Sequence, residues 1–120
     1  MAVTLFKLES NLGVAVGGFH DTVVLSFHLT PGDWVLIGRV VLNNFDGDDQ
    51  KASAQISSAG KPIDRADVTI SGRGSQVISL QGVMRADVNQ PVKLLAATFK
   101  GGAAEGSLIA IPIDTFTEEK

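Results

Sequence analysis

The sequence predicts an all-β fold, an antiparallel sandwich of two sheets, and three observations support this prediction. The 13 glycines and 4 prolines of the 120-residue chain leave no window of about 12 residues with an uninterrupted helical apolar stripe. Short runs rich in β-branched residues lie between these turn signals. Roughly eight or nine such runs, closely spaced along the chain, are typical of a sandwich or a barrel.

Each predicted strand is bounded by residues that favour turns. The strongest boundary is the Thr-Pro-Gly-Asp sequence at 30–33, and the stretches 43–49 and 71–75 are further turns rich in Asn, Asp, Gly or Ser. In order, the predicted strands are 3–8, 14–16, 22–29, 34–42, 50–57, 63–70, 76–84, 91–99 and 107–113. We expect one domain over residues 1–114, followed by a short polar tail at 115–120.

The polar and apolar patterning differs between strands. Strands 50–57 and 63–70 alternate, as expected for strands with one buried and one hydrated face. The stretches 34–42, 94–97 and 108–111 are apolar on both faces, and a sandwich of this size has no third layer to cover them. We therefore expect neighbouring subunits to cover one sheet, although exposed apolar area on a monomer is the alternative. The candidate interface residues are Val35, Ile37, Val41, Leu95, Ala97, Ile109 and Ile111.

Charge and composition disfavour several classes of partner. The net charge is −3 and the Lys and Arg residues are scattered, which argues against nucleic acid or a membrane surface as partner. The apolar runs are far shorter than the roughly 20 residues of a membrane helix. The absence of cysteine excludes thiolate catalysis, cysteine-based zinc sites and disulfides. No signal peptide is visible before strand 3–8, so the compartment stays open, including an extracellular or particle-associated one.

The acidic turn at 43–49 is the best candidate site. Asp46, Asp48 and Asp49 surround a glycine and could supply the hard oxygen ligands that calcium prefers. Their spacing differs from the EF-hand loop, and a hydrated turn is the alternative interpretation. No other cofactor is expected. Asn43, Asn44 and Arg73 are candidate ligand-binding residues in this turn and in the turn at 71–75.

Other chemistry-bearing residues point to ordinary structural roles. His20 and His28 lie in a predicted loop and on a strand, with no spacing typical of metal ligands. No Gly-x-Ser-x-Gly nucleophile elbow is present. Trp34 could stack on a sugar if it were exposed, but a buried tryptophan at the start of a central strand is the commoner case.

Three segments resemble the tumour necrosis factor and complement C1q superfamily of trimeric jelly rolls. Residues 22–38 are similar to the strand, Pro-Gly turn, aromatic and apolar strand passage of that superfamily. Residues 77–83 are similar to a central strand of its bacterial members. Residues 105–113, Glu-Gly-Ser-Leu-Ile-Ala-Ile-Pro-Ile, resemble the closing strand of the sheet that lines the trimer axis. The chain lacks tyrosine and has no aromatic residue beside the closing-strand glycine, so no receptor-contact residue carries over.

The resemblance implies an antiparallel two-sheet jelly-roll sandwich that forms a homotrimer. Its expected role is a non-enzymatic binding or structural module, which displays the loops 43–49, 71–75 and 100–105 to a cell-surface glycan, a protein or other subunits. A carbohydrate-binding lectin is one alternative. A small cupin-like metal enzyme is another, although cupins use several histidines and this chain has two.

Overall fold

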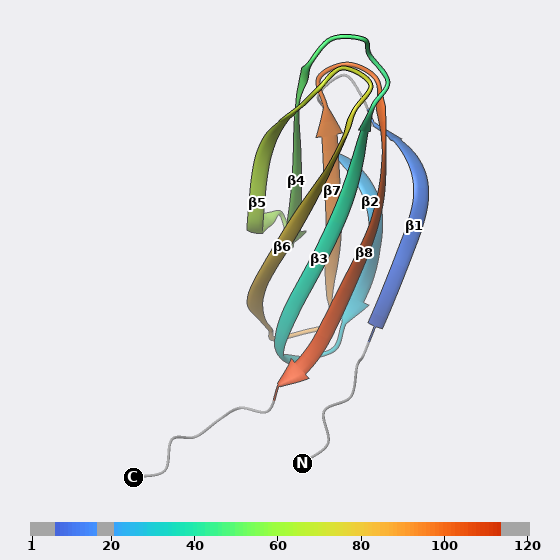
Figure 1. Cartoon of the computed structure of the whole chain (residues 1–120). Helices are drawn as coiled ribbons and strands as arrows, with labels where there is room; N and C mark the ends of the chain where they lie inside the picture. Colours follow the sequence, from blue (N-terminus) through green and yellow to red (C-terminus); the bar gives the residue numbers. More distant parts are fainter. Residues whose placement is uncertain (1–6, 17–20, 114–120) are drawn as a thin grey trace.

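The computed structural model describes residues 7–16 and 21–113, and side chains from residue 21 onward. All eight elements are strands (Figure 1). They are β1 (Lys7–Val16), β2 (Thr22–Leu29), β3 (Gly32–Asn44), β4 (Gln50–Ser58), β5 (Lys61–Ile70), β6 (Ser75–Ala86), β7 (Gln90–Thr98) and β8 (Gly102–Ile113).

The strands form two four-stranded antiparallel sheets that face each other. The front sheet has the order β1-β8-β3-β6 and the back sheet the order β2-β7-β4-β5 (Figure 1). Strand β1 pairs with β8, β2 with β7, β3 with β6 and β4 with β5. This nested pairing sends alternate pairs to alternate sheets. It is the topology of a jelly roll, which confirms the predicted fold class.

Most predicted strands are present, with differences at their ends. The bounds of β2 are as predicted. The prediction of separate strands at 3–8 and 14–16 was wrong, because β1 is one strand that pairs with β8 across an irregularity between Asn11 and Val14. The predicted loop at 100–105 was also wrong in part, since β8 already begins at Gly102. Cross-strand pairing there overrides the weak strand preference of Gly and Ala. Residues 3–6 and the predicted tail lie outside the described residues.

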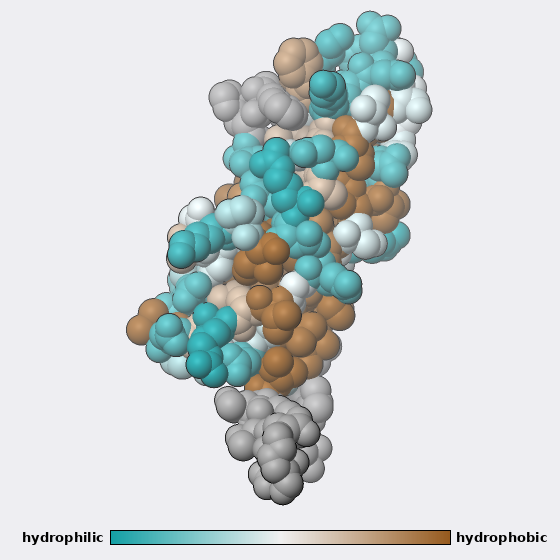
Figure 2. All heavy atoms as spheres, turned by 90° about the vertical axis from the view of Figure 1, so that its left-hand side faces the viewer, coloured by the Kyte–Doolittle hydropathy of each residue, from teal (hydrophilic) through white to brown (hydrophobic). Residues whose placement is uncertain are grey.

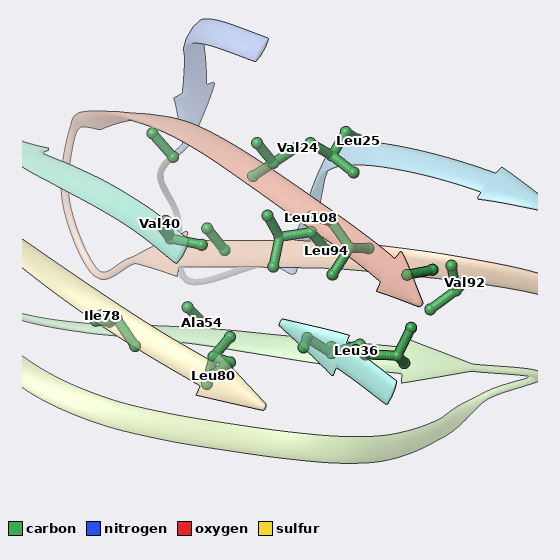
Figure 3. Close-up of a cluster of buried hydrophobic side chains, with 14 of the residues drawn as sticks. Val24, Leu25, Leu36, Val40, Ala54, Ile78, Leu80, Val92, Leu94 and Leu108 are labelled. Atoms are coloured by element: carbon green, nitrogen blue, oxygen red, sulfur yellow. The ribbon is translucent and has the colours of Figure 1, made fainter. Parts of the chain in front are cut away.

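Apolar side chains from both sheets fill the space between them. Leu36, Val40 and Leu108 of the front sheet and Ile56 and Leu94 of the back sheet are fully buried. Figure 3 shows Leu108 and Leu94 meeting in the middle of this cluster. The core explains why β3 and β8 carry an apolar residue at almost every second position.

Three glycines of the front sheet lie at inward-facing positions. Because they carry no Cβ, large side chains of the back sheet can approach the backbone of the front sheet closely. A Cβ at Gly106 would lie 2.6 Å from Leu94 Cδ2 and 3.2 Å from Val24 Cγ1. A Cβ at Gly38 would lie 3.2 Å from Ile56 Cδ1. Gly82 gives way to Ile63 in the same manner. The close distance between the two sheets therefore depends on glycine at these positions of the front sheet.

The prediction of one buried and one hydrated face was right for β5 and wrong for β4. Exposure alternates along the second half of β5, from Arg65 to Thr69. In β4, the outward-facing Ser53, Gln55 and Ser57 are buried as well. These side chains lie between β5 and β7, and Gln55 Nε2 donates a hydrogen bond to Asp21 Oδ2 at 2.9 Å.

We predict that Gly106→Ala destabilises the protein by about 1–3 kcal/mol, because the new methyl group meets the fully buried Leu94. The matched control is Gly101→Ala, where a Cβ has no atom within 4 Å. The control should change stability by less than about 1 kcal/mol. Urea unfolding of both variants measures the difference, and equal stability would contradict the close approach.

Candidate functional site

The outer face of the front sheet carries a contiguous apolar surface. Val35 of β3 lies opposite Val83 of β6 and Ile111 of β8, and Ile37 lies opposite Ile109. Side chains of opposed residues share one face and touch one another. Ile37 is 43% exposed and Val83 66%. We call this surface the apolar patch, and its residues are Val35, Ile37, Val83, Ile109, Ile111 and Ile113.

Figure 2 looks at the β5–β6 edge of the sandwich. Hydrophobic residues gather in a brown band along the lower right of the view, while the upper end is mainly hydrophilic. The right-hand side of this view is the side of the front sheet in Figure 1. The apolar patch thus lies toward the end of the front sheet where β3 begins, away from the end where β3 meets the loop to β4.

The predicted interface residues separate onto two faces. Val35, Ile37, Val41, Ile109 and Ile111 lie on the outer face of the front sheet, with Val41 beyond the edge of the apolar patch. Leu95 and Ala97 lie on the outer face of the back sheet, because β7 belongs to that sheet. Ala97 is already 2% exposed within the chain, so it has little surface left to offer a neighbour.

Sequence reasoning missed three members of this face. Val77 and Val83 of β6 and Ile113 of β8 are exposed and share it with the predicted residues. Val77 and Val83 are an even number of positions apart, so a period-two reading of strand 76–84 places them on one face. That β6 lies beside β3 follows only from the fold.

Polar residues frame the apolar patch. At one end, Arg85 Nε lies 2.9 Å from Asp33 Oδ1, and this hydrogen bond, reinforced by the charge attraction, raises the pKa of Arg85 above its ordinary value. On the other side, Ser107, Arg39 and Ser79 form a polar row across β8, β3 and β6. Beyond this row, Val41 lies opposite Val77 and Glu105. The face therefore combines apolar area with a small number of charges.

Loops from both sheets meet at the opposite end, where Asn44 joins them. Its side chain is 3% exposed. Asn44 Nδ2 donates to the carbonyl oxygens of Asp48 at 2.9 Å, Ile70 at 3.1 Å and Ser71 at 2.9 Å. Asn44 Oδ1 accepts from Asp46 N at 2.8 Å and from Gln50 Nε2. One amide thus connects the turn after β3 with the turn between β5 and β6.

Gln50 extends this network to the loop between β7 and β8. Its Nε2 donates to the Gly101 carbonyl at 2.9 Å, and its Oε1 accepts from Lys100 N at 2.6 Å. Backbone bonds add to the network, since Asn44 N donates to the Gly74 carbonyl and Phe45 N to the Gly101 carbonyl. The three loops at this end are therefore one hydrogen-bonded unit, which we call the loop end.

The predicted calcium ligands have separate contacts at the loop end. Asp46 Oδ1 accepts from Asp48 N at 2.9 Å, and Asp49 Oδ1 accepts from Gly72 N at 3.0 Å. Lys100 Nζ lies 3.8 Å from Asp46 and 4.0 Å from Asp48. Among residues 21–113, no three His, Asp or Glu side chains are grouped as metal ligands. A calcium ion would compete with Lys100 for the same oxygens, and calcium binding stays a prediction.

The predicted ligand-binding residues have different surroundings. Asn44 is buried and its amide is used inside the protein, so it is not accessible to a ligand. Asn43 is half-buried, and its Oδ1 accepts from Ser75 Oγ at 2.6 Å. Arg73 is exposed with φ of 56°, and its own backbone N donates to the Asp46 carbonyl at 2.8 Å. Of these three residues, Asn43 and Arg73 present side-chain surface at the loop end.

The remaining candidates fall outside any shared site. Trp34 is 3% exposed, and its Nε1 donates to the Thr30 carbonyl at 2.9 Å, which confirms the buried interpretation. His28 is exposed on β2, and His20 lies outside the described residues. A shallow hollow of about 510 Å³ lies beside the loop end, lined by Asp49, Gln50, Lys51, Thr69, Phe99 and Lys100.

Comparisons with known proteins support the fold. No protein-family model and no curated protein sequence matches the chain. A chain of infectious bursal disease virus, Gx strain, is similar with a TM-score of 0.58 at 12% identity, over 91% of this chain and 34% of that one. A Stig cyclase from Fischerella sp. TAU, solved with an indole compound, is similar with a TM-score of 0.52 at 12% identity. The match covers 73% of this chain and 54% of the cyclase.

The chain shares the fold of the matched parts of the viral chain and the cyclase. The globular domain of zebrafish complement 1qA is less similar, with a TM-score of 0.42 at 12% identity over 88% of this chain and 97% of that domain. The chain spans about a third of the length of the viral chain and about half of the cyclase. Similarity at 12% identity establishes the fold only. The function has to be argued from the surfaces of this chain. Within the described residues, no helix long and apolar enough to cross a membrane is present.

We predict that Asn44→Ala destabilises the protein by about 2–3 kcal/mol, because it leaves buried carbonyl groups without their donor. Asn43→Ala is the matched control one residue away, with a single side-chain partner in Ser75. It should cost less than about 1 kcal/mol. Thermal unfolding of both variants tests the role of Asn44, and similar losses would show that the amide is dispensable.

Proposed function

We propose that this protein is a non-enzymatic structural or binding module that assembles with its own copies, as a homotrimer, through the outer face of the front sheet. The observation that carries the proposal is the apolar patch. Single exposed apolar residues are ordinary on protein surfaces, whereas contiguous apolar surface is typical of an interaction site. Here two neighbouring strands, β3 and β8, are apolar on both faces, and the core explains one face only.

The position of the apolar patch suits such an assembly. It lies on the outer face of the front sheet, toward the end where β3 begins. The loop end lies at the other end of β3, so packing through the patch leaves the loops accessible (Figure 1). Several copies held together would present several loop ends to one partner, which strengthens weak individual contacts. A cell-surface glycan, a protein or another subunit of a larger particle is the partner class we propose.

The comparisons leave the class of activity to the surface argument. One similar structure is a viral chain and another is a cyclase, so the fold serves different roles. The non-enzymatic assignment rests on the described part of this chain, where the carboxylates of Asp33, Asp64 and Asp67 are already engaged in hydrogen bonds or ion pairs within the fold.

We predict that Ile37→Glu disrupts the assembly, because it places a charge within the apolar patch, beside Ile109. The matched control is Val23→Glu on the back sheet, where the side chain has the same exposed fraction of 43%. Light scattering behind a sizing column should give three times the chain mass for the natural protein and the control. The Ile37→Glu variant should give the mass of one chain.

Two results of this measurement would overturn the proposal. If the natural protein has the mass of one chain at micromolar concentration, its copies do not associate through the outer face of the front sheet. An Ile37→Glu variant that still assembles shows that another surface joins the subunits. Far-ultraviolet circular dichroism of each variant ensures that a changed mass does not reflect unfolding.

Carbohydrate binding at the loop end is a second candidate function. The exposed ring of Phe99 and the ammonium group of Lys51 line the hollow beside this end. We predict that a glycan array detects binding if the hollow is a sugar site, and that Phe99→Ala removes it while Phe45→Ala, at another exposed phenylalanine, retains it. An array without hits would eliminate this candidate.

A further inference from the structure

Two opposite charges on the outer face of the front sheet have no partner among residues 21–113. The charged side chains on the described part of this face are Asp33, Arg39, Arg85 and Glu105. Asp33 and Arg85 neutralise each other at 2.9 Å. In residues 21–113, neither Arg39 nor Glu105 forms an ion pair or a side-chain hydrogen bond. The described side chains thus leave one positive and one negative charge unpaired on the face that carries the apolar patch.

Both charges lie where burial would be costly. Arg39 is exposed in the polar row of β3, with Ile37 and Val41 two positions away on either side along the same face. Glu105 is half-buried on β8, opposite Val41. A charge that is removed from water without a partner destabilises an interface strongly. Copies that pack through this face therefore need to pair these groups.

The carboxylate of Asp64, which shares a hollow with Arg39, is already engaged. Asp64 of β5 lines a hollow of about 480 Å³ together with Arg39, Ile37, Ser79 and Gln81. Its Oδ2 accepts from Gln81 N at 2.9 Å and its Oδ1 from Arg65 N at 2.9 Å. Asp64 forms no ion pair with Arg39, because its oxygens bind the backbone of β6 and β5, and the guanidinium of Arg39 stays available.

We propose that Arg39 of one copy forms an ion pair with Glu105 of the next copy, which rests on the proposed assembly through this face. Arg39 lies opposite Ser107 and therefore diagonal to Glu105, at about 7–8 Å between backbones. Around a three-fold axis, this offset lets positive and negative groups alternate in a ring. The pair fixes the register of the copies, whereas the apolar patch supplies contact area.

Charge-reversal variants distinguish a specific ion pair between Arg39 and Glu105 from a general effect of charge on assembly. In Arg39→Glu, every contact between position 39 of one copy and position 105 of the next joins two carboxylates. In Glu105→Arg, every such contact joins two guanidinium groups. We expect each variant to dissociate at a concentration at least about tenfold higher than the natural protein. The double variant Arg39→Glu/Glu105→Arg restores opposite charges and should assemble like the natural protein. Lys93→Glu, a reversal on the exposed face of the back sheet, is the control and should assemble normally.

Mixing the two single variants shows whether the pair joins different copies. Neither variant can form the pair within its own chain. In a three-membered ring made from both variants, two of the three contacts join opposite charges, whereas a ring of either variant alone has none. Light scattering should therefore detect assemblies in an equal mixture at concentrations where each variant alone is dissociated.

The outcomes distinguish this inference from the proposed assembly. If the natural protein has the mass of one chain, the assembly itself is wrong and the pair with it. If the natural protein assembles and both reversals assemble equally well, the assembly stands and the pair is wrong. Dissociation that neither the double variant nor the mixture reverses also overturns the pair. Should a reversal unfold, Arg39→Gln and Glu105→Gln repeat the comparison with neutral side chains, and full assembly of both overturns the pair.

Discussion

The front sheet depends on β3, because this strand pairs with β6 along one side and with β8 along the other over almost its whole length. The pairing fixes which side chains face inward. Trp34 and Leu36 are buried between the sheets, and Val35 and Ile37 form part of the outer face. A slip of one residue would exchange these two sets. The same register places Asn44 beneath the loops, so the core, the outer face and the loop end follow from one strand.

Much of the fold was predictable because turn residues and β-branched runs act locally. The Pro-Gly sequence after β2 marks its end, and the alternation of β5 is visible in the sequence. The start of β8 was not predictable, since Gly102 to Glu105 contain residues of weak strand preference and become a strand only beside β1 and β3. The buried outer face of β4 also depends on its neighbours, such as the contact between Gln55 and Asp21.

The surfaces show the same limit. The doubly apolar pattern identified Val35, Ile37 and Ile109, but could not separate them from Leu95, because only the nested pairing assigns β7 to the other sheet. Asn44 belongs to a sequence of Asn, Asp and Gly that is typical of a hydrated turn. Its burial follows from loops 26 and more residues away, as the bond to Ile70 illustrates. Local patterns identify strands and turns, whereas contacts between distant segments decide what each side chain does.

The linkage of the three loops through Asn44 and Gln50 has a consequence for recognition. Loops that are independent in the free protein lose conformational freedom when they close on a partner, and this loss weakens the complex. At the loop end, the side-chain amides of Asn44 and Gln50 already hold the loops in one conformation in the folded protein. A partner that meets this end finds a preorganised shape, so selectivity there would come from complementarity of form, with little scope for adaptation to partners of different outline.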